Sequence, residues 1–365
     1  SLTANYHLLT KKLGGMKPSA VVKADGYGLG ALPITITLVN AGCRVFFVAT
    51  IEEGIRLRDG LNNAEISNFF DIEIHVLSGP AHNTEEAYKT SKLIPVLSSL
   101  DQIYKWQLYC QKIGQALSCD IHVDTGMSRL GLPPSELARL EIDTTLIESL
   151  NINLIISHLA CADSPDHKKN IEQLISFKHV RQILPQGRAS LANSSGIFLG
   201  TDYHFDLVRP GAALYGLEPV SGQANPMAQV VKLQGKIAQI RDIDTPQTVG
   251  YGATHSTEGP ARIATISVGY ADGYFRYLSG KGIGYIENYQ VPIVGRISMD
   301  LITLDITDVP EHLCQLGSLV DLIGPNNPVD LVAKNADTIG YEILTSLGPR
   351  FHRTYLSANN VSKIP

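Results

Sequence analysis

Lys23 is the residue whose type and setting in this sequence are best suited to chemistry. It stands inside the apolar run AVVKAD at 20–25, which has the composition of a buried β-strand. Burying a lysine as a cation is costly, so its pKa falls or it finds a charged partner. A lysine of that kind can attack a carbonyl compound and form a Schiff base. The alternative is a lysine at a strand end whose ammonium group reaches solvent.

Other polar residues stand at or just after the ends of later apolar runs. The glycine-rich stretch 26–30 would let the backbone approach a ligand closely. The loops 193–196 and 209–212 would suit a phosphate group, although either loop alone is ordinary. The polar residues at these ends are His122, Asp124, Arg129, Ser157, His158, Asn193, Ser194, Ser195 and Arg209.

The apolar runs themselves predict a parallel sheet. They lie at 20–25, 44–50, 73–79, 94–99, 119–124, 151–160, 188–195 and 205–211, and most are separated by stretches of helical character, such as 28–41, 52–59, 101–116 and 168–184. Near-continuous apolar strands that alternate with helices indicate parallel strands buried on both faces. Eight such units predict a (β/α)8 barrel, although the helices around the third and fourth strands are weak. In such barrels the carboxyl ends of the strands carry the active site.

The pattern changes after about residue 218. Short Gly, Pro and Asp turns now separate apolar segments at 228–242, 261–269, 283–296, 301–307 and 318–324, and the stretch 329–347 looks helical. We therefore predict an α/β barrel domain over 1–218 and a mostly antiparallel β-domain over 219–365.

The composition argues against several classes of function. The chain has 365 residues, of which 44% are hydrophobic and 18% charged, as in an ordered globular protein. A net charge of -5 without any Lys- and Arg-rich run argues against nucleic acid or an acidic membrane as a partner. Apolar stretches stay shorter than the ~18 uncharged residues that a membrane span needs.

The cysteines indicate a reducing compartment. The five are scattered, without a C-x-x-C pair, at Cys43, Cys110, Cys119, Cys161 and Cys314. We therefore expect neither a disulfide framework nor a metal site. The first residues lack a basic segment followed by an apolar core and a cleavage site, so we expect no export signal and a cytoplasmic location.

The sequence resembles the alanine racemases, a family of barrel-type enzymes that use pyridoxal 5'-phosphate (PLP). VVKADGYGLG at 21–30 resembles the lysine motif of that family. Seven further blocks follow in the family's order: VDTGMSRLG (123–131), SHLACAD (157–163), ANSSG (192–196), VRPGAALYG (208–216), VGYGAT (249–254), SVGYADGY (267–274) and VGRISMD (294–300). One block would be weak evidence, whereas eight in order across nearly the whole chain are strong evidence.

The resemblance implies a role for each residue around the cofactor. Lys23 would hold PLP covalently and transfer a proton on one face of the substrate, and Tyr251 would transfer one on the other face. Arg209 would face the pyridine nitrogen and keep it unprotonated, which weakens PLP as an electron sink. His158 would hydrogen-bond that arginine. The remaining cofactor-binding residues would be Tyr27, Asn193, Ser194, Gly211 and Ala212, most of them at the phosphate.

The resemblance also implies how the substrate and a second subunit bind. Arg129 and the backbone of Met299 would hold the substrate carboxylate, and Tyr270 would line the entrance. In this family Tyr251, Tyr270 and Met299 reach the PLP of the other subunit. The protein would then be a head-to-tail homodimer with two composite active sites.

The activity implied is the interconversion of L-alanine and D-alanine, which supplies D-alanine for cell-wall peptidoglycan. A racemase of broader specificity, acting on serine as well, is an alternative. A barrel-type PLP decarboxylase is a second one, but such enzymes pair the pyridine nitrogen with a carboxylate where this sequence has Arg209. A third is a PLP-binding carrier of the single-barrel kind, which lacks the β-domain.

Two positions depart from the family pattern. His122 stands where many members have a carbamylated lysine, whose negative charge holds the arginine that matches Arg129. Leaving that guanidinium unpaired in a closed cleft would cost several kcal/mol. Asp124 or a small anion such as chloride should therefore replace the carbamate, and we favour the anion. The segment 341–349 lacks the tyrosine that many members have near Pro349, a difference that concerns the entrance.

Overall fold

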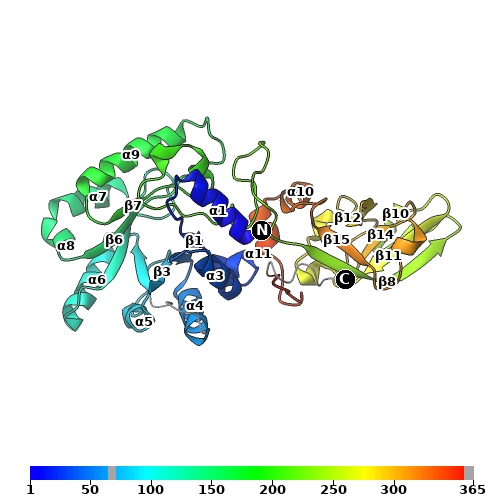
Figure 1. Ribbon diagram of the computed structural model, residues 1–365, viewed down its shortest axis with the longest axis horizontal. Coiled ribbons are helices and arrows are strands. Elements are labelled where there is room, and N and C mark those ends of the chain that lie inside the picture. Colours follow the sequence, from blue (N-terminus) through cyan, green and yellow to red (C-terminus); the bar gives the residue numbers. More distant parts are fainter. Residues whose placement is uncertain (65–70, 357–365) are drawn as a thin grey trace. The chain divides into compact units, whose positions relative to one another are not determined.

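The computed structural model describes residues 1–64 and 71–356. Its contacts divide the chain into two compact units, Ser1–Ala228 and Gln229–Pro365. Figure 1 labels many of the elements of both units. The domain boundary that we predict after residue 218 lies in a stretch without helix or strand, and it stays a prediction.

A seven-stranded parallel sheet forms the centre of the first unit, with its strands in chain order. The strands are β1 (Ala20–Val21), β2 (Val45–Val48), β3 (Glu73–Val76), β4 (Ile94–Leu97), β5 (Ser118–His122), β6 (Asn151–Ile156) and β7 (Arg188–Ser190). All four residues of β2 are buried, as expected for a parallel strand covered on both faces. The predicted barrel-type α/β fold is therefore confirmed.

Helices alternate with these strands and form an arc around them in Figure 1. They are α1 (Leu2–Lys12), α3 (Ala31–Asn40), α4 (Ile51–Asn63), α5 (Glu85–Thr90), α6 (Leu100–Ile113), α7 (Pro134–Ile142), α8 (Thr144–Glu148) and α9 (Lys169–Ile183). Local sequence explains several ends: the Thr50 side chain accepts the Glu53 N–H at the start of α4, and α6 stops at Gly114, which has a φ of 64°. The weak helical pattern after the third strand corresponds to α5, which has only 6 residues.

The eighth predicted strand needs a correction, because residues 205–211 form no regular strand in the described sheet. The segment nevertheless lies between β7 and β1: the Leu207 N–H donates to the Ala189 carbonyl, and the Val21 N–H donates to the Pro210 carbonyl. Pro210 has no N–H to continue a ladder, and Phe205 has a φ of 49°. Isolated hydrogen bonds therefore close the barrel at this position.

Ion pairs that cross the sheet support this closed shape. Glu73 in β3 pairs with Arg188 in β7, although three strands lie between them in the sheet order. His75 in β3 likewise pairs with Asp120 in β5. Side chains from non-adjacent strands can meet in this way only on the inner face of a curled sheet, so these four residues point into the barrel.

The second unit is built on a six-stranded antiparallel sheet in the order β13-β12-β15-β8-β11-β14. Its strands are β8 (Leu233–Ile243), β11 (Ala261–Ile266), β12 (Ile283–Ile286), β13 (Tyr289–Pro292), β14 (Ile302–Asp305) and β15 (Leu319–Ile323). The predicted antiparallel β-domain is confirmed. One predicted strand, 283–296, is wrong as a single element, because a turn with Glu287 at a φ of 53° splits it into the hairpin β12–β13.

Three shorter features complete the second unit. The hairpin of β9 (Thr248–Val249) and β10 (His255–Ser256) was not predicted, because each strand has only 2 residues. The predicted helical stretch becomes two helices, α10 (Val329–Asn335) and α11 (Gly340–Thr345).

Across the described parts of both units, we find no helix with the length and apolar character that crossing a membrane requires.

Candidate active site

Lys23 follows the carboxyl end of β1 and begins α2 (Lys23–Tyr27), which is a left-handed turn and no ordinary helix. The φ angles are 53° at Ala24, 52° at Asp25, 63° at Gly26 and 56° at Tyr27. Backbone hydrogen bonds hold the turn, including those from the Gly26 N–H to the Val22 carbonyl and from the Gly28 N–H to the Ala24 carbonyl. The lysine therefore stands at the active-site end of the barrel, on a backbone with an unusual conformation.

The electrostatic surroundings of Lys23 favour its neutral amine. Burial lowers the pKa of Lys23, and the positive charge of Arg129 lowers it further, while Glu53 acts in the opposite direction. A lowered pKa increases the fraction of nucleophilic amine at neutral pH. This is the state that the sequence pattern predicts for a lysine able to form a Schiff base.

The loop after β7 and the segment 209–213 meet at Ser194. The Ser194 hydroxyl oxygen accepts the N–H groups of Gly211, at 3.0 Å, and Ala213, at 3.1 Å. Because two donors already occupy that oxygen, the hydroxyl proton is left to bind an acceptor elsewhere. Asn193 stabilises the same loop, since its side-chain oxygen accepts the Gly196 N–H at 2.9 Å.

Tyr27, four residues after Lys23, packs against the same segment at Gly211. Its ring stacks on Tyr215 with 4.5 Å between the ring centroids, and it is buried. A Cβ atom at Gly211 would collide with the Tyr27 hydroxyl, so only glycine allows this approach. The Ala212 N–H has no acceptor among the residues that the structure describes. Hydroxyl and backbone donors thus converge here, as they do in phosphate sites.

Arg209 is buried below these residues and is held by neutral acceptors. One guanidinium nitrogen donates to the Ser190 carbonyl at 2.8 Å and to the Ser190 hydroxyl, and another donates to the Ser157 carbonyl. Burial lowers the pKa of Arg209 to about 10, although the nearby Asp120 carboxylate opposes this effect. The guanidinium stays positive at neutral pH.

Two histidines near Arg209 are neutral at the same pH. Burial, together with Arg209 and Arg129, lowers the pKa of His158 to about 3. Burial and Arg209 lower the pKa of His122 to about 4. The hydrogen bond that the resemblance implies between His158 and Arg209 is absent from the described contacts, because Ser157 and Ser190 bind the guanidinium instead.

Arg129 lies on an exposed loop after β5, and Asp124 shapes that loop. The Asp124 carboxylate accepts the backbone N–H groups of Gly126 and Met127, each at 2.8 Å, and that of Ser128 at 3.0 Å. Asp124 therefore stabilises the loop and forms no ion pair with Arg129 in the described structure.

Two guanidinium groups at this end of the barrel, those of Arg129 and Arg209, have no ion-pair partner in the parts of the chain that the structure describes. Within residues 1–64 and 71–356, none of Lys23, Arg129 and Arg209 forms an ion pair with a carboxylate. Unbalanced cations beside converging hydroxyl and backbone donors are suited to an anionic ligand. A phosphate-bearing aldehyde such as PLP fits this donor set, because Lys23 offers an amine and the groups around Ser194 offer phosphate donors.

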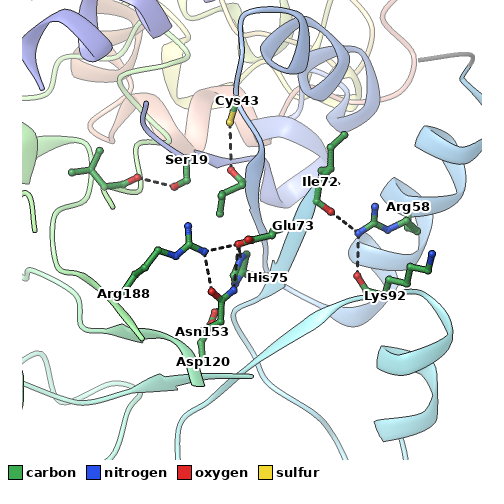
Figure 2. Close-up of polar contacts among 12 residues, drawn as sticks. Ser19, Cys43, Arg58, Ile72, Glu73, His75, Lys92, Asp120, Asn153 and Arg188 are labelled. Atoms are coloured by element: carbon green, nitrogen blue, oxygen red, sulfur yellow. Dashed lines mark hydrogen bonds and ion pairs between the residues drawn. The ribbon is translucent and has the colours of Figure 1, made fainter. Parts of the chain in front are cut away.

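A second set of charged residues lies one layer deeper in the same barrel (Figure 2). His75 contacts Asp120 at 2.6 Å through Nδ1 and Glu73 at 3.1 Å through Nε2. The Arg188 guanidinium donates to Glu73 at 2.6 Å and to the Asn153 side chain at 3.0 Å. Here every cation has a carboxylate partner, in contrast to the layer that contains Lys23.

In the second unit, Tyr251 lies on the turn between β9 and β10 and is 73% exposed. Glycines shape this turn, with a φ of 77° at Gly250 and 73° at Gly252. A Cβ atom at Gly252 would lie 3.0 Å from the Arg296 guanidinium, so Arg296 packs closely against the turn. This contact brings the VGYGAT and VGRISMD blocks together.

Tyr270 and Met299 lie side by side in the second unit. The Tyr270 N–H donates to the Ser298 carbonyl at 3.1 Å, and the Ala271 N–H donates to the Met299 carbonyl at 3.0 Å. Both side chains are exposed, at 42% for Tyr270 and 54% for Met299. The three blocks of the second unit therefore present large exposed side chains from one set of connected turns, as interaction surfaces do.

Sequence reasoning missed two groups at the site. Ser190, inside β7, binds Arg209, and a serine within an apolar strand was the available signal. Glu53 carries no such signal, because it stands in a Glu-containing helix start and looks like an ordinary first-turn residue. Its side chain accepts the Ala24 N–H, next to Lys23.

Comparisons with known proteins agree with the sequence blocks. The family model of the alanine racemase N-terminal domain matches residues 1–219, and that of the C-terminal domain matches residues 230–355. An alanine racemase of Rhodospirillum rubrum is 50% identical over 346 residues, which cover 94% of this chain and 91% of that protein. A catabolic alanine racemase of Mesorhizobium japonicum is 45% identical over 98% of this chain and 91% of that protein.

Solved structures extend the similarity to the fold. The alanine racemase of Bartonella henselae with covalently bound pyridoxal phosphate has a TM-score of 0.90 and 45% sequence identity, and the match covers 97% of each chain. The alanine racemase of Streptomyces coelicolor A3(2) has the same TM-score of 0.90 at 28% identity. Since the family models together match most of the chain, it belongs to the alanine racemase family, whose members are PLP-dependent racemases.

Proposed function

We propose that this protein interconverts L-alanine and D-alanine with PLP bound at Lys23. The observation that carries the proposal is Lys23 itself: its pKa is lowered, it follows β1, and it stands among cations that lack a carboxylate partner. Family membership supports the same activity. A supply of D-alanine for cell-wall peptidoglycan is the metabolic role that fits, and the five free cysteines fit a cytoplasmic location.

The residues of the first unit would hold the cofactor. Lys23 would bind it covalently, Arg209 would face the pyridine nitrogen, and His158 would lie beside that arginine. Bound PLP delocalises the electron pair that remains when an amino acid loses its α-proton. The phosphate would bind to Tyr27, Asn193, Ser194, Gly211 and Ala212.

Arg209 would limit side reactions. A guanidinium can donate a hydrogen bond but has no proton to give at neutral pH, so a nitrogen that faces it stays unprotonated. That choice weakens the electron sink and favours return of the proton to carbon. A carboxylate in this place, as in barrel-type decarboxylases, would do the opposite.

Two groups of this protein would move the protons. The Lys23 amine, once displaced from the cofactor by the substrate, would take or return the α-proton on one face of the carbon. Tyr251 of the partner subunit would serve the opposite face, so that removal on one side and delivery on the other inverts the centre. The exposure of Tyr251 supports this role, since the group must reach an external substrate.

The remaining site residues would bind the substrate and form the entrance. Arg129 and the backbone of Met299 of the partner subunit would hold the substrate carboxylate, and Tyr270 of the partner subunit would line the entrance. We therefore include a head-to-tail homodimer with two composite sites in the proposal. The exposed side chains on the connected turns of the second unit support it.

The direct test is to incubate the purified protein with PLP and L-alanine and to quantify D-alanine with an enantiomer-specific assay. We expect D-alanine to accumulate until both enantiomers are equal. L-serine in a parallel reaction tests the broader specificity, and release of carbon dioxide tests decarboxylation. A protein that binds PLP but forms no D-alanine would overturn the proposal.

A further inference from the structure

The turn that carries Lys23 is strained. Four consecutive residues, Ala24 to Tyr27, have φ between 52° and 63°, and only Gly26 is free of the steric cost of this region. In a left-handed conformation, the Cβ atom of any residue other than glycine comes too close to the following carbonyl oxygen. A backbone of this kind persists only where surrounding contacts determine it. Contacts around the turn must therefore keep it from relaxing.

Most of those contacts come from within the turn or from residues next to it. The Gly26, Gly28 and Gly30 N–H groups donate to the carbonyls of Val22, Ala24 and Asp25. The Asp25 side chain accepts the Ala31 N–H at 2.8 Å, which fastens the turn to the start of α3. Bonds between residues so close in sequence can move together with the turn. They do not fix its place in the barrel.

Glu53 supplies a contact from another part of the barrel, in addition to the stacking of Tyr27 on Tyr215. Its carboxylate accepts the Ala24 N–H at 2.7 Å through one oxygen and the Ala49 N–H at 2.7 Å through the other. Ala24 comes directly after Lys23, Ala49 is the first residue after β2, and Glu53 lies in the first turn of α4. One carboxylate thus ties the first strained residue to the neighbouring strand, with hydrogen bonds of the strong, charge-assisted type.

The same carboxylate is the negative charge that faces Lys23. The charged groups that act on the lysine are Arg129, which lowers its pKa, and Glu53, which raises it. His158 also faces it but is neutral at pH 7, because burial lowers its pKa to about 3. Glu53 therefore acts on Lys23 in two ways, through the backbone of the next residue and through its charge.

We infer that Glu53 is a positioning residue for Lys23: it fixes the strained turn after β1 to β2 and α4, so that the amine is held where the cofactor aldehyde binds. This inference rests on the proposed function, because it assigns Glu53 to the site where PLP would bind. Without this carboxylate the turn relaxes, and the lysine amine loses its fixed position. Covalent capture of PLP then becomes slower and weaker.

The test is Glu53→Gln, which keeps the shape of the side chain but replaces one acceptor oxygen by an NH2 group. That group faces a backbone N–H, so one of the two bonds is lost and a donor opposes a donor. We expect the apoprotein to bind PLP about ten- to a hundredfold more weakly than wild type, as followed by absorbance titration. The rate of PLP capture increases with pH as the Lys23 amine loses its proton. In the variant we expect this increase to begin at a lower pH than in wild type, because the neutral side chain no longer raises the pKa of Lys23. A residue with only a structural role would not shift this pH dependence.

Glu52→Gln is the matched control. Glu52 is the exposed neighbour of Glu53 in the same helical turn. Glu52→Gln therefore removes one negative charge but leaves both hydrogen bonds of Glu53 in place, and we expect PLP binding within about twofold of wild type. Glu53→Asp keeps the charge but is too short to reach both amides, and we expect an intermediate loss. If Glu53→Gln fails to fold by circular dichroism, Glu53→Asp decides the question.

Each outcome points in one direction. Weaker PLP binding by Glu53→Gln and Glu53→Asp, with Glu52→Gln unchanged, supports the inference. Wild-type binding by both Glu53 variants overturns it and leaves the proposed function intact. A wild-type protein that captures no PLP overturns the proposed function instead.

Discussion

Two layers of side chains at the barrel differ in whether their charged groups form ion pairs. The register places Asp120 in β5 level with Arg188 in β7, and His122 level with Ser190, two residues nearer the active-site end. In the deeper layer, Arg188, Glu73, His75 and Asp120 form a chain of ion pairs (Figure 2). At the active-site end, Arg129 and Arg209 have no such partners among the described residues, and the lowered pKa of Lys23 favours its neutral amine.

The histidines of the two layers show the difference most clearly. Burial acts to lower the pKa of all three, but Asp120 and Glu73 raise that of His75 to about 9. His122 and His158 face cations instead, and their pKa values fall to about 4 and about 3. At neutral pH the deeper histidine is therefore a cation within an ion-pair network, and the other two are neutral side chains in a positive site.

This contrast separates structural charge from functional charge. Charges that are balanced within the protein need no ligand, and they fix how the strands pack. Charges that the protein leaves unbalanced require an anion from outside, and a cofactor phosphate or a substrate carboxylate supplies one. We can test the distinction by changing one residue of each layer and measuring both stability and activity.

Lys23→Ala should have the largest effect. We expect it to abolish covalent PLP binding and racemisation in both directions, because no other amine stands at the end of β1 in the described structure. Borohydride reduction followed by peptide mapping checks the assignment in the wild type. A label on another lysine would refute it, whereas a label on Lys23 alone would agree with it.

Tyr251→Phe should come next. Removing one general acid-base group typically lowers the rate by about 10²–10⁴-fold. We expect this loss for proton exchange that starts from the enantiomer that Tyr251 serves, with PLP still bound at Lys23. Solvent isotope incorporation into each enantiomer measures it. Retention of more than about a tenth of the wild-type rate would mean that Tyr251 has only a structural role.

His75→Gln should act on stability and leave the chemistry nearly unchanged. Removing the cation leaves the buried Asp120 carboxylate without its ion-pair partner, while Glu73 keeps Arg188, and breaking a buried pair costs about 3–5 kcal/mol. Urea denaturation of the apoprotein measures the loss. The exposed pair of Lys105 and Asp101 offers a control, since Lys105→Gln should cost less than about 1 kcal/mol. A large fall in kcat of folded His75→Gln would contradict the separation of the two layers.

The two layers should also limit stability at opposite ends of the pH range. The pKa of His75 is raised from 6.5 to about 9, so its contribution is complete below pH 6.5 and disappears as the pH rises through 9. For this fully buried group the loss is on the order of 3 kcal/mol. The pKa values of His122 and His158 are lowered from 6.5, so their contributions are complete above pH 6.5 and are lost as the pH falls through 4.

Unfolding of the apoprotein in urea across pH 4–10 measures both limits. In His75→Gln the decline above pH 7 should become shallower, and in His122→Asn the decline below pH 6 should become shallower. An unchanged alkaline decline in His75→Gln would show that the buried histidine is neutral in the folded protein.

The sequence was sufficient to predict a candidate site at the carboxyl end of the barrel strands, but it does not predict the layer of ion pairs beneath that site. The blocks around Lys23, Arg129 and Arg209 carry their own order and spacing, so family resemblance finds them. Glu73, His75, Asp120 and Arg188 also stand in the predicted strands. Which of them meet depends on the curvature of the sheet, because their partners come from non-adjacent strands.

Two other features depend on backbone geometry that no pattern in the sequence states. The segment 205–211 has the apolar composition of a strand, yet Pro210 and the positive φ of Phe205 prevent a regular ladder. Glu53 has the position of an ordinary helix-start residue, and only the left-handed turn after Lys23 brings the Ala24 N–H to it. In both cases composition describes the segment, but local backbone conformation decides which hydrogen bonds it makes.

The smallest effect we predict concerns the anion that Arg129 lacks. The structure removes one candidate, because three backbone N–H groups already occupy the Asp124 carboxylate. His122 remains: its Nδ1 lies 3.3 Å from the Ser98 hydroxyl, and if that hydroxyl donates, Nε2 carries the proton and can donate to an anion. The loop that carries Arg129 returns to His122, since the Leu132 N–H donates to the His122 carbonyl at 2.8 Å. A chloride ion bound between the two side chains would supply the missing negative charge.

Chloride should therefore raise the activity in a saturable manner. The measurement is the racemisation rate in chloride-free buffer, followed by titration with chloride while a large anion keeps the ionic strength constant. We expect a rise of a few-fold, because Arg129 is exposed and water screens part of its charge. His122→Phe keeps the volume of the ring but removes the donor, and it should abolish the chloride response while the basal rate persists. A flat response in the wild type would mean that His122 only packs inside the barrel, and Arg129 would then depend on the substrate carboxylate alone for its counter-charge.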